Sequence, residues 1–133
     1  MRSKSRVEIS SSIDIITARQ QGRTMAMELG FVGSDLTLVA AAISEVTRNI
    51  VDYAQRGEIV LEPIQRNGQS GIMIIARDQG PGIVDVAKAM QYGYSSRKGL
   101  GVGLPGAKWL MDEFDIVSKV GKGTTVTMKK WVS

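Results

Sequence analysis

The chain has 133 residues, which suits one domain, so we expect a single domain over residues 1–133. It has no cysteine and no histidine, which excludes disulfides, thiolate chemistry, zinc centres and histidine-based triads. Any acid–base catalysis therefore falls to a carboxylate. The net charge of +4 suits a phosphate-rich ligand or an acidic partner, and the low aromatic content (5%) gives no reason to expect a nucleic-acid partner.

The hydropathy pattern predicts no membrane partner. No stretch approaches the roughly 20 apolar residues that cross a bilayer. The basic N-terminus runs directly into a polar, alternating pattern and lacks the apolar segment of a signal peptide. We therefore expect a cytoplasmic protein.

The first half of the chain predicts one strand followed by two helices. Residues 6–10 alternate like a short strand. Apolar residues then recur every three or four positions, which predicts a helix closed by Gly30 and a second one from Ser34 towards Gly57. Gly22 lies inside the apolar stripe of the first helix, which indicates close packing against another element.

The second half predicts a sheet interrupted by a glycine-rich region. Asn67-Gly68 is a strong hairpin signal, Pro63 favours an edge position or a bulge, and the apolar run 72–76 is typical of a central strand. The predicted elements are strands over 58–65 and 72–76, a short helix over 84–90, a helix over 104–113, and a hairpin of strands over 115–120 and 124–131. Amphipathic helices need a sheet to cover. This order predicts an α/β (α+β) two-layer sandwich, with one mixed β-sheet covered by a layer of helices.

A polar stripe on the second predicted helix is the first candidate site. Glu45, Asn49 and Asp52 are spaced i, i+4 and i+7, so they share one face. A carboxylate there can accept a proton, while an amide one turn away offers an oxygen to Mg²⁺. A solvated helix face has the same spacing, and the spacing alone does not separate the two.

An aspartate followed by glycines forms the second candidate site. Asp78 stands where a buried strand meets Gly80-Pro81-Gly82, so its carboxylate can accept a hydrogen bond from a ligand amine. Glycines let a flat ring approach the backbone closely. A plain turn is the alternative, because Asp, Gly and Pro are turn formers.

A glycine-rich loop that opens a helix is the third candidate site. Gly99, Gly101 and Gly103 supply successive free amides at a helix N-terminus, which favours anion binding. Arg97 and Lys98 directly precede the loop and are candidate phosphate contacts. A dinucleotide-binding fingerprint is excluded by the element order, and a Walker loop by the missing Gly-Lys-Ser/Thr ending. A flexible hinge remains the alternative.

The order of these blocks matters more than any one of them. Together with Gly121-x-Gly123-Thr124, which alone predicts only a hairpin turn, they closely resemble the nucleotide-binding signature of the GHKL superfamily (the Bergerat ATP-binding fold) over the whole chain. Within it, the chain resembles the stressosome switch kinases of the RsbT type, relatives of the anti-sigma-factor kinases RsbW and SpoIIAB. The stretches that carry this closer resemblance are 18–20, 28–31, 43–45, 48–50, 78–83, 99–106 and 110–114.

The resemblance implies a role for each matching residue. Glu45 would be the general base, Asn49 would hold Mg²⁺, and Asp78 would accept from the adenine amino group. The remaining ATP-binding residues would be Gly80 and Gly82 around the adenine, Gly99, Gly101 and Gly103 around the phosphates, and Thr124. The segment 92–98 would be the lid.

The resemblance also implies a function. It indicates a protein serine/threonine kinase that uses ATP and Mg²⁺ to phosphorylate STAS-domain proteins of the RsbS and RsbR kind. After release, such a kinase would activate a downstream enzyme such as an RsbU-type phosphatase in a bacterial stress response. The alternatives are an anti-sigma factor with kinase activity, or a non-catalytic nucleotide-gated binding module. Glu45 argues against the last, because binding alone needs no base beside the cation.

Overall fold

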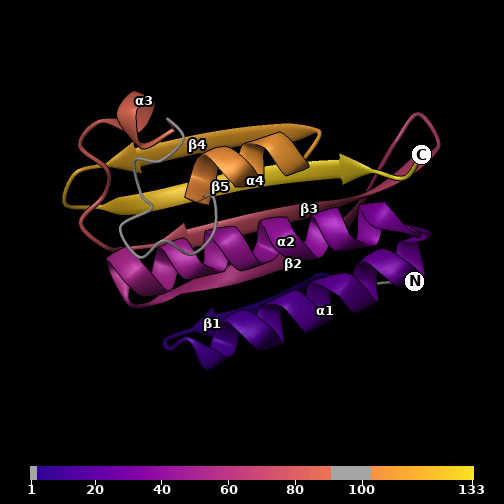
Figure 1. The fold of residues 1–133 in the computed structure, drawn as a ribbon, viewed down its shortest axis with the longest axis horizontal. Coiled ribbons are helices and arrows are strands. Elements are labelled where there is room, and N and C mark those ends of the chain that lie inside the picture. Colours follow the sequence, from indigo (N-terminus) through magenta and orange to yellow (C-terminus); the bar gives the residue numbers. More distant parts are fainter. Residues whose placement is uncertain (1–2, 91–102) are drawn as a thin grey trace.

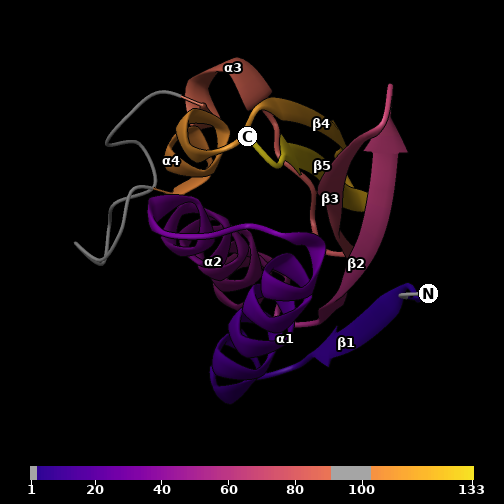
Figure 2. The ribbon, with the colours of Figure 1, turned by 90° about the vertical axis from the view of Figure 1, so that its right-hand side faces the viewer.

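A five-stranded sheet and a layer of helices on one of its faces form the molecule (Figures 1 and 2). The computed structural model describes residues 3–90 and 103–133. The elements are β1 (Ser5–Ile9), α1 (Ile13–Leu29), α2 (Ser34–Asn49), the π-helical turn η1 (Ile50–Ala54), β2 (Gly57–Arg66), β3 (Gln69–Asp78), α3 (Val86–Ala89), α4 (Gly103–Leu110), β4 (Glu113–Lys119) and β5 (Gly123–Trp131). The predicted two-layer α+β class and the element order are confirmed.

The sheet is antiparallel at every strand pair of the described residues, so the predicted mixed sheet is wrong in this respect. The strand order is β1-β2-β3-β5-β4. β1 ends at Ile9, and the helical hairpin α1–α2 then brings the chain back to the same end of the sheet, where Gly57 begins β2 and pairs with Ile9. β3 and β4 do run parallel to each other, but β5 lies between them and is antiparallel to both.

Two predicted helices end earlier than the sequence suggested. The second is α-helical only to Asn49 and then widens into η1, which Gln55 closes with a left-handed φ of 70°. The last ends at Leu110 instead of residue 113, because strand pairing with β5 takes the next residues. The amide of Asp112 donates to the carbonyl of Lys129 at 3.0 Å, and Glu113 opposes Lys129 in the ladder.

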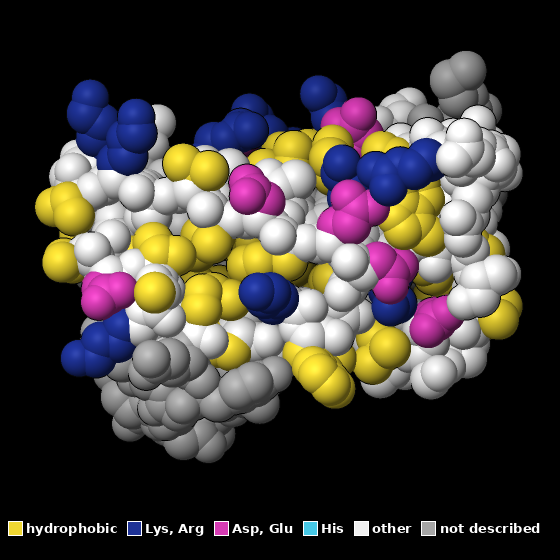
Figure 3. Space-filling view, turned by 90° about the horizontal axis from the view of Figure 1, so that it is seen from above, with side chains coloured by type: hydrophobic (Ala, Val, Ile, Leu, Met, Phe, Trp, Pro, Cys, Tyr) yellow, Lys and Arg dark blue, Asp and Glu magenta, His cyan; other side chains and the backbone are white. Residues whose placement is uncertain are grey.

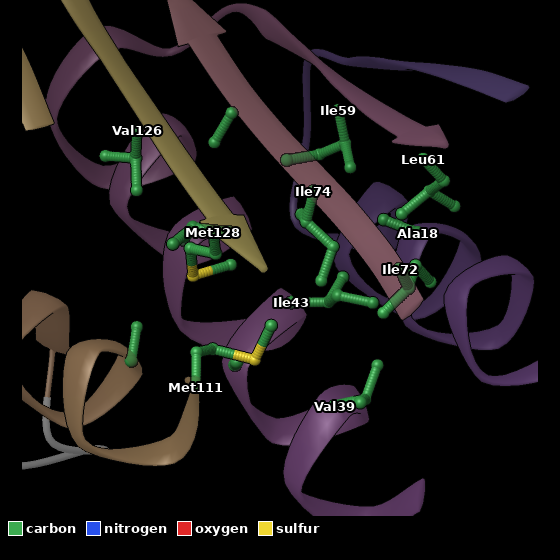
Figure 4. Close-up of a cluster of buried hydrophobic side chains, with 14 of the residues drawn as sticks. Ala18, Val39, Ile43, Ile59, Leu61, Ile72, Ile74, Met111, Val126 and Met128 are labelled. Carbon is green, nitrogen blue, oxygen red and sulfur yellow. The ribbon is translucent and has the colours of Figure 1, made fainter. Parts of the chain in front are cut away.

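The core lies between the helical hairpin and the sheet (Figure 4). Ile43 of α2 is fully buried and lies among the inward side chains of β2 and β3. Each such aliphatic side chain stabilises the fold by about 1.5–3 kcal/mol relative to an exposed one. The predicted close packing at Gly22 is confirmed, since a Cβ there would overlap the Ile43 side chain. The core side chains labelled in Figure 4 are Ala18, Val39, Ile43, Ile59, Leu61, Ile72, Ile74, Met111, Val126 and Met128.

The hairpin between β2 and β3 has the predicted turn. Asn67 and Gly68 adopt φ values of 52° and 80°, and Arg66 pairs with Gln69 across them. Positive φ at both central residues is the geometry that Asn-Gly favours. Pro63 lies in β2, beyond Leu61, the last residue of β2 that pairs with β1, so within residues 3–90 and 103–133 no strand pairs with β2 on that side of Pro63.

A cluster of charged and aromatic side chains closes the far end of the sheet. The Glu113 carboxylate accepts from Arg66 Nη1 at 2.7 Å and from Trp131 Nε1 at 2.9 Å. The Arg66 guanidinium also lies 4.5 Å from the centre of the Trp131 ring. The hydrogen bond from Arg66, followed by that from Trp131, lowers the pKa of Glu113 below its ordinary value.

This lowered pKa makes a prediction about pH. The ionised Glu113 stabilises the fold fully above the pKa of an unfolded-state glutamate, about 4.3, and the contribution is lost as the pH falls through the lower folded-state pKa. Urea unfolding of the wild type and Glu113→Gln from pH 7 to pH 3 measures it. We expect the wild type's advantage to shrink on acidification. A difference that is constant over this range would contradict the assignment.

The molecule's surface mixes charge with exposed apolar side chains. Figure 3 views the face above α3, α4 and β4, on which hydrophobic side chains lie among Lys, Arg, Asp and Glu. Two of the most exposed hydrophobic residues are Val84 (88%) and Trp109 of α4 (80%). Within residues 3–90 and 103–133, no helix has the length and apolar character needed to cross a bilayer.

Candidate functional site

A cavity of about 450 Å³ opens where β3 ends and β5 begins, beside the C-terminal end of α2. In Figure 1 this is the left end of the sheet. The volume lies in the range of small-molecule sites. The lining residues are Asn49, Tyr53, Ala54, Asp78, Pro81, Gly82, Ile83, Val84, Asp85, Lys88, Ala89, Leu104 and Thr124.

Asp78 is the buried acid of this cavity, with 8% of its surface exposed. Its Oδ1 accepts from the backbone amides of Gly80 at 2.9 Å and Thr124 at 3.3 Å. These bonds fix the carboxylate against the glycine turn and β5. Among the described residues, no donor bonds Oδ2. Because Asp78 lines the cavity, a carboxylate oxygen left without a donor there can accept from a ligand N–H.

The π-helical turn η1 shapes one wall of the cavity. Tyr53 and Ala54 of this turn both line the cavity. Gly80 packs so closely on this turn that a Cβ there would lie 2.6 Å from the Cβ of Ala54. Extra residues in a helical turn occur frequently at functional sites. Sequence periodicity carries no signal for such a turn, so the prediction missed it.

Gly82 shapes the opposite wall. Its φ is 78°, and a Cβ on it would overlap the Lys119 carbonyl oxygen and lie 2.7 Å from the Lys119 carbonyl carbon. The neighbouring amide of Gly121 donates to the Pro81 carbonyl at 2.8 Å. The β4–β5 turn and the glycine turn therefore hold each other, and both Gly80 and Gly82 are required by close packing.

The chain offers a matched pair of variants that isolates this packing. Gly68→Ala has the same left-handed backbone (φ 80°) with no atom near the new Cβ, so it should cost about 1–2 kcal/mol. Gly82→Ala adds the overlap with the Lys119 backbone, which should cost about 1–3 kcal/mol more. Urea unfolding of both variants gives the difference. Equal losses would mean that the turn relaxes freely and does not shape the cavity.

Ser118 links three segments behind the cavity. Its Oγ accepts the Ile83 amide at 2.7 Å and lies 2.7 Å from Thr124 Oγ1. It also lies 3.3 Å from the Gly123 carbonyl oxygen, to which it can donate. Ile83 and Thr124 line the cavity, whereas Ser118 does not. A serine in an alternating strand looks like an ordinary polar position, so the sequence pattern did not single it out.

Glu45 and Asn49 lie one turn apart on α2, as predicted, but they face different spaces. Asn49 lines the cavity, while Glu45 lines a groove between α1 and α2 that also contains Arg19 and Arg48. The Glu45 side chain is 12% exposed. Its Oε2 lies 3.4 Å from Arg48 Nη1, and its Oε1 accepts the Gly103 amide at 3.0 Å. Glu45 therefore holds the first residue of α4, between the cavity and the groove.

Asn49, the one predicted metal ligand, lines the cavity. Within the described residues, no group of three or more acidic side chains could form a metal site. Mg²⁺ in nucleotide enzymes takes few protein ligands and is held mostly by phosphates and water. One amide oxygen on the cavity wall fits Mg²⁺ that arrives on a nucleotide, and does not fit a site built from protein alone.

Comparison with known proteins agrees with this geometry. A family model described as "Histidine kinase-like ATPase domain" matches residues 11–130. The chain is 48% identical to the serine/threonine-protein kinase RsbT of Bacillus subtilis (strain 168), over 99% of both chains. It belongs to this ATPase family. It is also 30% identical to an anti-sigma F factor of Caldanaerobacter subterraneus subsp. tengcongensis, over 93% of this chain and 90% of the relative.

A solved structure shares the fold of this ATPase family. It contains the RsbU and RsbW domains of Rv1364c from Mycobacterium tuberculosis and superimposes with a TM-score of 0.59 at 24% identity. The match covers 95% of this chain and 32% of the solved one, so the chain spans about a third of that protein. Membership of the family and the similarity to RsbT make the chain an ATP-dependent serine/threonine-protein kinase.

Several predicted site residues cannot be compared with the geometry. Gly99, Gly101, Arg97, Lys98 and the predicted lid over 92–98 lie outside the described residues. Asp52, the third member of the predicted stripe, lies in η1 and is not part of the cavity lining. The cavity residues that the prediction missed are mostly apolar, namely Tyr53, Ala54, Pro81, Ile83, Val84, Ala89 and Leu104, together with Asp85 and Lys88.

Proposed function

We propose that this kinase transfers the γ-phosphoryl group of ATP to a serine or threonine of a small STAS-domain partner, and that phosphorylation releases the partner. The observation that carries the proposal is the position of Glu45, one helical turn from the cavity-lining Asn49 and open to the α1–α2 groove. A nucleotide in the cavity and a protein segment in the groove would meet at this carboxylate.

The adenine base occupies the cavity at Asp78 in this proposal. The free Oδ2 accepts the exocyclic amine, while Oδ1 stays bonded to Gly80 and Thr124. Glycine is required at 80 and 82 because a Cβ would overlap Ala54 or the Lys119 backbone, so these two positions hold the walls around the base together. The phosphates extend past Asn49 towards the N-terminus of α4, where the positive end of the helix dipole favours anions, while the Gly103 amide itself stays bonded to Glu45. Gly99, Gly101 and Thr124 are the further nucleotide contacts, with Arg97 and Lys98 as candidate phosphate contacts.

Glu45 acts as the general base. The substrate hydroxyl oxygen attacks the γ-phosphorus, the bond to the β,γ-bridging oxygen breaks, and ADP leaves with that electron pair. Glu45 takes the hydroxyl proton. Each of its oxygens keeps a lone pair beyond the contacts with Gly103 and Arg48, so those contacts can hold the carboxylate in position while it accepts the proton. Mg²⁺, held by Asn49 and the phosphates, would neutralise charge on the transferred group.

Partner release follows from the charge that transfer creates. The modified hydroxyl carries about −1.5 to −2 charges at pH 7 and stays beside Glu45. Like charges at an interface cost several kcal/mol, and about 3 kcal/mol lowers affinity more than a hundredfold. The freed surface then binds a second partner. The partners we propose are RsbS- and RsbR-like STAS proteins as substrates, and an RsbU-like phosphatase as the enzyme that the released kinase activates, in a cytoplasmic stress pathway.

Radiolabel transfer tests the proposal. The chain is incubated with Mg²⁺, [γ-³²P]ATP and a purified STAS protein, and its affinity for the unmodified and phosphorylated substrate is then measured. We expect label on a serine or threonine of the STAS protein and binding at least a hundredfold weaker after modification. Transfer without weaker binding would leave a kinase that does not switch partners. No transfer to any STAS substrate would refute the substrate class.

An anti-sigma factor with kinase activity is the second candidate. The similarity to anti-sigma F factors supports it, although at 30% identity against 48% for RsbT. Binding of a purified sigma factor by the nucleotide-loaded chain distinguishes the two.

A further inference from the structure

Ser118 occupies a position from which it controls the Thr124 hydroxyl. The two oxygens are 2.7 Å apart, and Thr124 is 5% exposed, on the cavity wall. The amide of Thr124 bonds to Asp78 Oδ1, so its backbone is fixed next to the carboxylate. Only the direction of its hydroxyl hydrogen is left to be decided, and Ser118 is its partner in the described structure.

The hydrogens allow two arrangements. Ser118 Oγ already accepts the Ile83 amide at 2.7 Å and has one hydrogen to donate. If that hydrogen goes to the Gly123 carbonyl at 3.3 Å, Thr124 donates to Ser118 and presents lone pairs to the cavity. If it goes to Thr124 at 2.7 Å, Thr124 has its own hydrogen free to donate into the cavity.

An aminopurine selects the second arrangement. Beside the exocyclic amine of adenine lies a ring nitrogen that only accepts hydrogen bonds. Asp78 Oδ2 accepts from the amine, so the neighbouring group on the wall has to donate. We infer that Ser118 is a positioning residue, which holds the Thr124 hydroxyl as a donor, directly or through one water, to this ring nitrogen.

The result is a continuous chain of donors. It runs from the Ile83 amide to Ser118 Oγ, from Ser118 to Thr124 Oγ1, and from Thr124 to the base. Hydrogen bonds in such a chain polarise and strengthen one another. An oxopurine reverses both positions, because it presents an acceptor to Asp78 and a donor to Thr124. Ser118 therefore contributes to the choice of base although it does not line the cavity.

This inference rests on the proposed placement of adenine at Asp78, and its test separates the two. The probe is 1-deaza-ATP, in which the ring nitrogen is replaced by C–H while the amine is kept. The wild type should bind ATP about tenfold more tightly than 1-deaza-ATP, because 1-deaza-ATP lacks one hydrogen bond to the protein. If ATP does not bind at all, the proposed function fails. If both nucleotides bind equally, only the role of the hydroxyl pair fails.

Variants assign the preference to Ser118. In Ser118→Ala the ratio of the two affinities should fall to about twofold, and Ser118→Thr, which keeps the hydroxyl, should restore it. Thr127→Val is the matched control, since it removes a hydroxyl from the other face of β5. In a Thr124→Val background, Ser118→Ala should leave the ratio unchanged, because Ser118 acts through Thr124. A tenfold preference that persists in Ser118→Ala would overturn the inference, as would equal weakening of both nucleotides.

Discussion

Replacing Glu45 by glutamine is expected to slow phosphoryl transfer by about 10²–10⁴-fold while ATP affinity stays nearly constant. Glutamine keeps an oxygen that can accept the Gly103 amide, so α4 stays anchored as in the wild type. It cannot take a proton from the substrate hydroxyl. Single-turnover transfer and isothermal titration with ATP, on the same preparation, measure the two effects separately.

Glu45→Ala serves as the companion variant. It removes the base and also the acceptor for the first amide of α4, and losing such a cap costs about 1 kcal/mol. We therefore expect equal loss of transfer in both variants, but lower stability only in the alanine. Substantial transfer by Glu45→Gln would show that Glu45 is an anchor for α4 and not a base.

Asp78→Asn should weaken ATP binding by about a hundredfold. The amide oxygen can replace Oδ1 as acceptor for Gly80 and Thr124, and the NH₂ group then points where Oδ2 was. The exocyclic amine of adenine would meet a donor instead of an acceptor. A charge-assisted hydrogen bond is lost and a buried donor is left unpaired, which together cost about 3 kcal/mol.

Asp85→Asn provides the matched control for this variant. Asp85 lines the same cavity, and its side chain caps α3 by accepting the Lys88 amide at 3.0 Å. Asparagine caps a helix about as well as aspartate. We expect ATP affinity within about twofold of the wild type. If both variants bind alike by isothermal titration, the general negative charge of the cavity matters and the contact at Asp78 does not.

Local chemistry made part of this fold predictable. Asn67-Gly68 predicts a tight hairpin, and Gly22 inside an apolar helix stripe predicts a close contact with another element. The spacing of the apolar residues, every second residue in strands and every third or fourth in helices, predicts the order of the elements. The antiparallel sheet was not predictable in this way. Whether β5 enters between β3 and β4 depends on pairing between strands distant in the chain, and no local pattern records it.

In the site, too, local sequence predicts some residues, while others depend on contacts between distant parts of the chain. Asp78 stands out in sequence because it follows an apolar strand and precedes a glycine turn, and Asn49 because it follows Glu45 by one helical turn; both line the cavity. Ser118 and the π-helical turn act through positions that look ordinary in sequence. The contact between Glu45 and Gly103 joins residues 58 positions apart, so only the folded chain brings it about.

A crystal structure of the chain with Mg²⁺ and a non-hydrolysable ATP analogue tests the central claim most directly. The account predicts the adenine amine on Asp78 Oδ2, the metal on the Asn49 side-chain oxygen, and the γ-phosphate on the side of Asn49 that faces Glu45. Adenine bound away from Asp78, or a γ-phosphate pointing away from Glu45, would contradict it.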